Sequence, residues 1–148
     1  MIDKIDEKDL AILDVLKEHS EYTVRKIAKK TLLAPTTVHA RIKKLKKIGV
    51  IKRFTIDIDK EKLGMKIGAY ILISADLKLL KEKNKSQHSL AQEIMKLSGV
   101  ENAEIVAGGT DIIALIRVKS IEELDKILLS KIQLLEGVSK TQTMIIIH

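Results

Sequence analysis

The chain has 148 residues, of which 45% are hydrophobic and 32% are charged, and it contains no cysteine. This composition excludes a disordered tail, and the lack of cysteine excludes disulfides, thiolate metal ligands and cysteine nucleophiles. No apolar run approaches the roughly 18 residues of a membrane-spanning helix, and acids and lysines interrupt the first twenty residues, where a secretory leader would be apolar. We therefore expect one domain or two small ones in the cytoplasm, with no membrane segment.

The formal net charge of +7 is concentrated in one segment. Residues 22–53 contain eight lysines, three arginines and no acid, whereas the other 116 residues come close to balance. A helical surface in water normally mixes both signs, so an acid-free segment of this length indicates a surface that faces a polyanion such as nucleic acid. A lysine-rich surface of the kind found in thermophilic proteins is the alternative.

Three short helices are predicted in the first part of the chain. Residues 6–18 have the apolar spacing of an amphipathic helix, with Asp6 as its N-cap. Thr23 is a favourable N-cap for a second helix. Pro35 fits the first position of a third helix, and Gly49 fits its left-handed C-terminal position.

The pattern changes to alternation over residues 50–58, which predicts a short strand. Two short helices joined by a tight turn within residues 23–47, followed by a strand, predict a winged helix-turn-helix domain over residues 1–56. Residues 57–66 are interpreted as a linker.

An internal repeat predicts the architecture of residues 67–148. Residues 94–100 recur as residues 132–138, and each copy is expected to end a helix at Gly-Val before a β-rich segment. Strand-like runs also precede both helices; the predicted strands span residues 67–75, 103–107, 112–119 and 141–147. Two β-α-β units predict a ferredoxin-like βαββαβ domain, an antiparallel sheet with both helices on one face, and hence an α+β fold. Lysine-rich residues 78–87 lack periodicity and are expected to form a flexible loop.

The third helix has the two faces of a DNA recognition helix. At 100° per residue, Val38, Ile42 and Leu45 form one stripe that faces the core. The opposite side carries polar or small residues, namely Thr36, Thr37, His39, Ala40, Lys43, Lys44 and Lys47. Short side chains at a helix start can touch base edges, and later lysines can meet phosphates. A lysine-coated helix in a bundle is the alternative.

Several motifs together resemble one known family. In the first half they are Ile5-Asp6 to Leu16, Arg25-Lys26-Ile27-Ala28, Leu33 to Val38, Arg41 to Leu45 and Gly49-Val50-Ile51. In the second half they are Gly108-Gly109 with Asp111, and Gly137-Val138 with Thr141 and Thr143. These motifs look like the Lrp/AsnC (feast/famine) transcriptional regulators, of archaeal type, over essentially the whole chain.

The resemblance implies a regulator that binds double-stranded DNA and dimerises through the sheets of its C-terminal domain. In that family the dimers often assemble into tetramers or octamers, and small amino-acid effectors bind where dimers meet. Ala34 departs from the family pattern because a serine often caps the recognition helix there, and Thr110 stands where an aromatic residue is frequent. Without that aromatic wall we expect a small polar effector or none.

The candidate sites follow from the residues and the resemblance together. The candidate DNA-binding residues are Thr23, Arg25, Thr36, Thr37, His39, Ala40, Arg41, Lys43, Lys44, Lys47 and Arg53. Arg41 lies between the two faces of its helix, so structural packing and phosphate contact both stay open. Arg53 belongs to the predicted wing.

The candidate effector-binding residues are Gly108, Gly109, Thr110, Asp111, Thr141 and Thr143. The glycine N–H groups can approach a ligand carboxylate, and Asp111 can pair with an ammonium group. Turn chemistry is the alternative role for Asp111.

Other function classes have little support in the sequence. No phosphate-binding glycine loop occurs. The four histidines, His19, His39, His88 and His148, show no paired spacing, so a metal site is not expected. No cofactor is expected either. The prediction is a sequence-specific DNA-binding regulator that is not an enzyme. The alternatives are a sirohaem-type tetrapyrrole decarboxylase of the same two-domain build and a DNA-compacting architectural protein.

Overall fold

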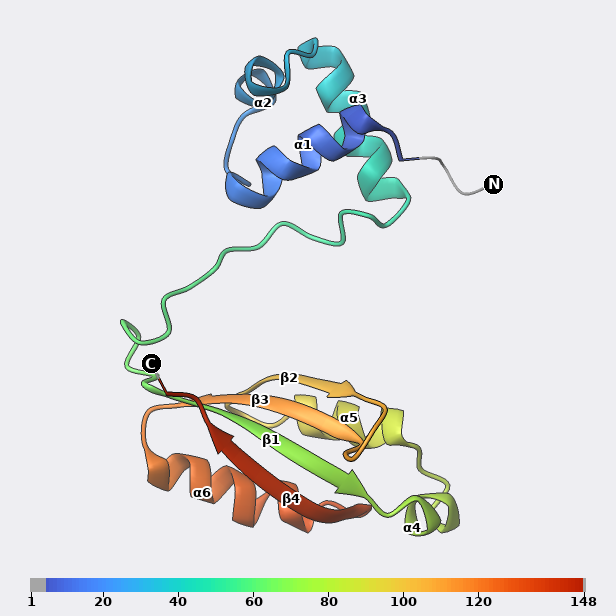
Figure 1. Ribbon diagram of the computed structural model, residues 1–148, viewed down its shortest axis with the longest axis vertical. Coiled ribbons are helices and arrows are strands. Elements are labelled where there is room, and N and C mark those ends of the chain that lie inside the picture. The colour runs from blue at the N-terminus through green and yellow to red at the C-terminus, as the bar shows by residue number, and fades with distance from the viewer. Residues whose placement is uncertain (1–4, 148) are drawn as a thin grey trace. The chain divides into compact units, whose positions relative to one another are not determined.

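The computed structural model describes residues 5–147 (Figure 1). The chain divides into two compact units, of which the first ends at Asp57 and the second begins at Ile58. Each unit has its own hydrophobic core. The predicted domain ranges also include residues 1–4 and 148, which lie outside the described residues. Among the described helices, none is long and apolar enough to cross a membrane.

The first unit consists of three helices, α1 (Glu7–Glu18), α2 (Val24–Thr31) and α3 (Pro35–Lys47). As predicted, Asp6 and Thr23 cap α1 and α2 by accepting hydrogen bonds from backbone N–H groups of the first turn. Ala34 precedes α3 without a side-chain cap, and Pro35 occupies its first turn. Gly49 follows α3 with a φ of 77°, the left-handed conformation expected there.

The core of the first unit orients α3. Val38 and Leu45 are fully buried, and Ile42 is partly buried against the cluster that contains Val38, which confirms the predicted apolar stripe. Side chains of α1 and α2, including Ile12 and Ile27, form the rest of the core. Because one stripe of α3 is held inside, its opposite side is turned to solvent.

The strand predicted for residues 50–58 is not formed in the structure. This segment is irregular, although Phe54, Ile56 and Ile58 keep the alternation and are exposed. A strand needs a neighbouring strand for its backbone hydrogen bonds, and the described part of this unit contains only helices. The apolar alternation in the sequence therefore predicted a strand that the structure does not form, and residues 52–58 are all exposed instead of alternating between two faces.

The second unit is a four-stranded antiparallel sheet in the order β2-β3-β1-β4. The strands are β1 (Ile67–Ala75), β2 (Val100–Ile105), β3 (Ile112–Val118) and β4 (Val138–Ile145). Helices α5 (Gln87–Met95) and α6 (Ile121–Ser130) lie on the same face of the sheet and share its core (Figure 1). The predicted ferredoxin-like βαββαβ fold is confirmed. β2 and β4 each start three residues before the predicted strands.

The flexible loop predicted for residues 78–87 is wrong. Helix α4 (Leu77–Glu82) occupies most of it, with Asp76 as N-cap, and α5 begins at Gln87. Only Leu80 of α4 is buried, which leaves no periodic apolar signal in so short a helix.

The second copy of the repeat also differs from its prediction. It forms a short 3₁₀ turn, Ile132–Leu134, after α6 has ended. Gly137 then adopts a φ of 99°, and a side chain at this position would collide with Leu80. The glycine thus permits close packing of α4 against the start of β4.

Candidate DNA interface and ligand pocket

The solvent side of α3 carries small and polar residues near its start and lysines toward its end. Its residues, called here the outer face of α3, are Thr36, Thr37, His39, Ala40, Lys43 and Lys47; all are exposed except Thr37, which is half-buried. The free N–H groups and the dipole at the start of α3 favour an anion such as a phosphate there. The structure therefore brings these sequence-predicted residues onto one surface.

Lys46 also lies near this surface, although it is not among the DNA contacts predicted from the sequence. Its side chain is exposed, and its Nζ lies 4.8 Å from the centre of the Phe54 ring. This cation–π contact links α3 to the irregular segment that follows it. The sequence does not indicate this contact, because Phe54 lies in the segment that is predicted to form a strand.

The remaining predicted DNA contacts lie outside α3. Thr23 is exposed, and its hydroxyl oxygen accepts a hydrogen bond from the N–H of Lys26. Arg25 is exposed in the first turn of α2. Arg53 is exposed in the irregular segment rather than on the predicted wing strand.

Two predicted DNA contacts instead face α1. Arg41 Nη1 lies 2.7 Å from Asp6 Oδ1 and 2.8 Å from Asp9 Oδ1. Lys44 Nζ lies 3.3 Å from Asp9 Oδ2. The structure thus shows for Arg41 the packing contacts that were one of its two possible roles, and it pairs Lys44, which was predicted to contact DNA, with a carboxylate of α1. Sequence reasoning missed the pairing because the partners are 32 and 35 residues apart.

Asp9 is fully buried, and its ionised form is nevertheless favoured over its protonated form. Burial alone would raise its pKa, but hydrogen bonds from Arg41, from the Asp6 N–H and from Lys44 outweigh burial and lower the pKa. The backbone N–H of Asp9, followed by Arg41, lowers the pKa of Asp6. The same two carboxylates raise the pKa of Arg41.

We expect these lowered pKa values to make the stability of the first unit depend on pH. A carboxylate with a lowered folded-state pKa contributes stability that is complete above its unfolded value of 3.8 and is lost as the pH falls through the folded value. Asp9→Asn leaves Arg41 without its buried partner and should destabilise the chain by about 3 kcal/mol at neutral pH. Thermal unfolding at pH values from about 3 to 7 should show the difference between wild type and variant shrinking below about pH 4. A difference that stays constant over this range would contradict the ion-pair account.

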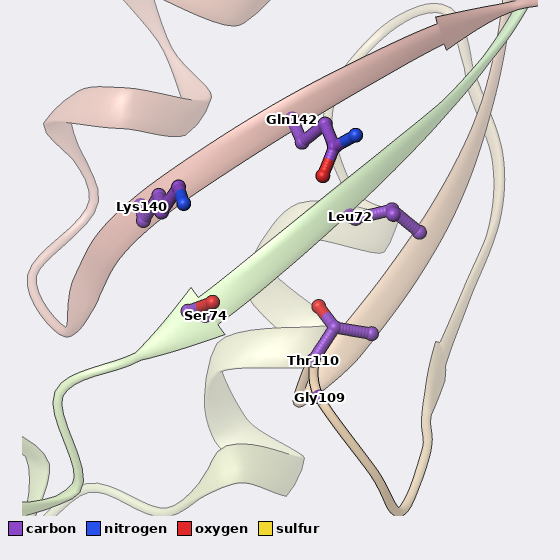
Figure 2. Close-up of a pocket in the computed structure, with 6 residues that line it drawn as sticks. All are labelled: Leu72, Ser74, Gly109, Thr110, Lys140 and Gln142. Atoms are coloured by element: carbon purple, nitrogen blue, oxygen red, sulfur yellow. The ribbon is translucent and has the colours of Figure 1, made fainter.

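The pocket nearest the predicted effector residues opens on the sheet face that α5 and α6 leave uncovered. It has a volume of about 340 Å³, and its lining residues are Leu72, Ser74, Gly109, Thr110, Lys140 and Gln142 (Figure 2). In Figure 2 these residues come from β1, β4 and the turn before β3. Of the six predicted residues, Gly109 and Thr110 line this pocket.

Asp111 has the turn role that was left open as its alternative. Its Oδ2 accepts a hydrogen bond of 2.8 Å from the Ala75 N–H, and its Oδ1 accepts one of 2.8 Å from Gln87 Nε2. Its own N–H donates to the carbonyl of Ile73. Asp111 thus ties the turn to the end of β1 and the start of α5, beside the pocket.

Thr141 and Thr143 do not share the pocket. They pair with Ile73 and Ile71 in the sheet register, which places them on the helix-covered face. Thr141 there accepts a hydrogen bond of 2.8 Å from Gln133 Nε2. Lys140 and Gln142, which alternate with these threonines along β4, line the pocket instead. The residues after Gly137 do not alternate clearly between polar and apolar. The sequence therefore does not indicate which of them face the helices and which face the pocket.

The uncovered face of the sheet has an apolar centre. It is called here the open face, and its apolar residues are Tyr70, Leu72, Ile113, Leu115 and Met144. Ile71 and Ile73 alternate with them and are buried under the helices.

Within the described part of the chain, no group of three or more His, Cys, Asp or Glu residues is placed to hold a metal ion.

Both units match known protein families. A model of the winged helix-turn-helix DNA-binding domain matches residues 5–52. A model of the Lrp/AsnC ligand binding domain matches residues 69–148, which is more than half of the chain.

Individual proteins match over nearly the whole chain. An HTH-type transcriptional regulator of Pyrococcus furiosus is 34% identical over 98% of this chain and 94% of its own length. The HTH-type transcriptional regulator FL11 of the same organism is 35% identical over 97% of this chain and 89% of its own length. The structure of E. coli AsnC is similar with a TM-score of 0.84 at 28% identity, covering 98% of this chain and 93% of that one.

The feast or famine regulatory protein Rv3291c of M. tuberculosis, solved in complex with L-methionine, has the same fold. Its TM-score is 0.85 at 23% identity, covering 98% of this chain and 93% of that one. Fold, family models and relatives agree with the resemblance seen in the sequence. The chain belongs to the Lrp/AsnC family of HTH-type transcriptional regulators.

Proposed function

We propose that this regulator recognises specific sequences in double-stranded DNA through the outer face of α3, as a two-fold dimer. The observation that carries the proposal is the arrangement of that face, with short side chains at the start of α3 and Lys43 and Lys47 farther along. Such a helix can place its first turn against base edges while its lysines contact phosphates. Because chromosomal DNA is the partner, the chain would act in the cytoplasm, and we propose no catalytic activity for it.

Sequence discrimination is assigned to the first part of the outer face. The methyl groups of Thr36, Thr37 and Ala40 suit contacts with the C5-methyl group of thymine, and His39 can hydrogen-bond to a base edge. We therefore expect half-sites that contain A·T pairs.

The open face supports self-association. Its apolar residues would remain in water in a monomer, and pairing with the same face of a second chain would bury them. The antiparallel sheet has helices on only one side, which leaves this face available. Tetramers and octamers, as in the family, would add contacts at other surfaces.

The pocket on the open face supports binding of an amino acid, the class of ligand present in the Rv3291c complex. The Lys140 ammonium group can pair with the ligand carboxylate, and the Gly109 backbone can approach the ligand closely (Figure 2). The lining has no aromatic residue, which favours a small polar side chain. Asp111 would position the turn beside the pocket through its hydrogen bonds with Ala75 and Gln87.

We expect Lys140→Gln to weaken effector binding at least about tenfold, because a charge-assisted bond to the carboxylate is lost. Titration calorimetry of the full chain with each of the twenty amino acids identifies the ligand, and the variant is then titrated with it. Thr143→Val, on the other side of the same strand, is the control and should leave the affinity unchanged. Equal affinities for wild type and Lys140→Gln would place the site elsewhere, and no heat with any amino acid would indicate a regulator without such an effector.

The DNA proposal is tested by selecting bound fragments from the source genome with the full chain, with and without a pool of amino acids. Recovery of a shared A·T-containing motif supports sequence-specific recognition. Fragments with no shared motif would contradict it and favour the DNA-compacting alternative.

A further inference from the structure

A fully buried carboxylate connects α1 to the recognition helix. The Asp9 side chain is 0% exposed, and both of its oxygens are used by cations of α3. Oδ1 lies 2.8 Å from Arg41 and Oδ2 lies 3.3 Å from Lys44. Arg41 also pairs with Asp6, the N-cap of α1, so the start of α1 is fixed to the middle of α3.

We propose that Asp9 is a positioning residue for DNA recognition, which holds Arg41 and Lys44 against α1 and thereby keeps both cations from the phosphates. The proposal rests on the function proposed above and deepens it. It divides the cations of α3 into two groups. Arg41 and Lys44 hold the helix in place, and Lys43 and Lys47 contact DNA.

Helix geometry supports this division. Arg41 and Lys44 are three residues apart and share one side of α3, whereas Lys43 and Lys47 are four residues apart and share another. A rotation of α3 that brought Arg41 to the DNA would break the ion pairs with Asp6 and Asp9. It would also lift Val38 and Leu45 out of the core. The ion pairs and the apolar stripe therefore specify the same orientation of the outer face.

The division of charge has a consequence for specificity. Non-specific DNA binding depends on the number of phosphate contacts, whereas specificity is the ratio of specific to non-specific affinity. Residues 22–53 contain eleven cations and no acid, so they would bind any duplex strongly if all cations were available. Asp9 neutralises part of this charge from outside the segment and limits binding to DNA that also fits the first turn of α3.

The first test compares Asp9→Asn with Asp14→Asn in the full chain. Both remove one negative charge from α1, but Asp14 is 73% exposed and pairs with Lys17, one turn away on the same helix. Affinities for the selected fragment and for a scrambled duplex are measured over a range of salt concentrations. For Asp9→Asn we expect a salt slope steeper by about 0.9 per released cation that reaches a phosphate. The specificity ratio should fall about tenfold, the order of one lost base contact.

Asp14→Asn should change both quantities little. Equal changes in the two variants would mean that only net charge matters, and this would overturn the proposal. Wild-type chain that binds neither duplex at low salt would instead overturn the proposed function itself.

A second test does not depend on the stability of Asp9→Asn. Lys44→Gln and Lys43→Gln are neighbouring substitutions on α3 with the same change of charge, and Lys44 is only partly buried. Lys44→Gln should leave the salt slope for the scrambled duplex unchanged, whereas Lys43→Gln should flatten it by about 0.9 per lost contact. Equal flattening by both would show that Lys44 already contacts phosphate, which the proposal excludes.

Discussion

Replacing both Lys43 and Lys47 by alanine is expected to weaken binding to every duplex sequence by roughly a hundredfold at physiological salt. The two lysines lie one turn apart on the exposed side of α3, in a segment without acids. Each lost phosphate contact should flatten the slope of log affinity against log salt by about 0.9, hence by about 1.8 for each protomer. Affinity measurements on specific and scrambled duplexes at several salt concentrations provide both quantities.

A double replacement of Lys78 and Lys81 by alanine is the matched control. Both residues are exposed on α4 in the second unit, and their removal changes the net charge equally. We expect it to leave the salt slope close to that of the wild type. A loss of affinity confined to one sequence, or an unchanged slope for the Lys43 and Lys47 variant, would show that the outer face is assigned wrongly.

Leu115→Glu is expected to convert the proposed dimer into a monomer. Leu115 is central on the open face, opposite Tyr70 of β1 and Asn102 of β2. Two-fold pairing of this face would bury the new carboxylates without cationic partners, so we expect the dimer dissociation constant to rise by a factor on the order of a hundred to a thousand. The same variant should lose most of its affinity for a two-fold DNA site, because its two recognition helices would no longer be linked. Sedimentation equilibrium measures the first effect and a binding titration the second.

Leu134→Glu provides the control for this experiment. Leu134 is 73% exposed in the 3₁₀ turn after α6, so the same chemical change occurs away from the open face. This variant should remain a dimer. If Leu115→Glu also remained a dimer, self-association would have to use another surface.

The sequence predicted best those features that depend on local patterns. Asp6 and Thr23 were identifiable as caps because a side-chain oxygen before an amphipathic run satisfies free N–H groups. The stripe of Val38 and Leu45 followed from helical spacing, and it correctly oriented the outer face of α3. The repeat predicted both β-α-β units because each unit needs the same turn between helix and strand.

Features that depend on contacts between distant residues could not be predicted in this way. Nothing near Arg41 in the sequence indicates that its partners are Asp6 and Asp9. Which side of β4 faces the helices depends on the register of β4 with β1. This register places Lys140, and not Thr141, in the pocket. Helix α4 likewise packs through one residue, Leu80, which reaches the core.

A hydroxyl-radical footprint of the wild-type chain on its selected fragment tests most directly the claim that α3 recognises DNA as part of a two-fold dimer. Two protected patches related by a dyad are expected, with centres separated by about 10 to 10.5 base pairs or a multiple of this spacing. A single protected patch without dyad symmetry would contradict this claim.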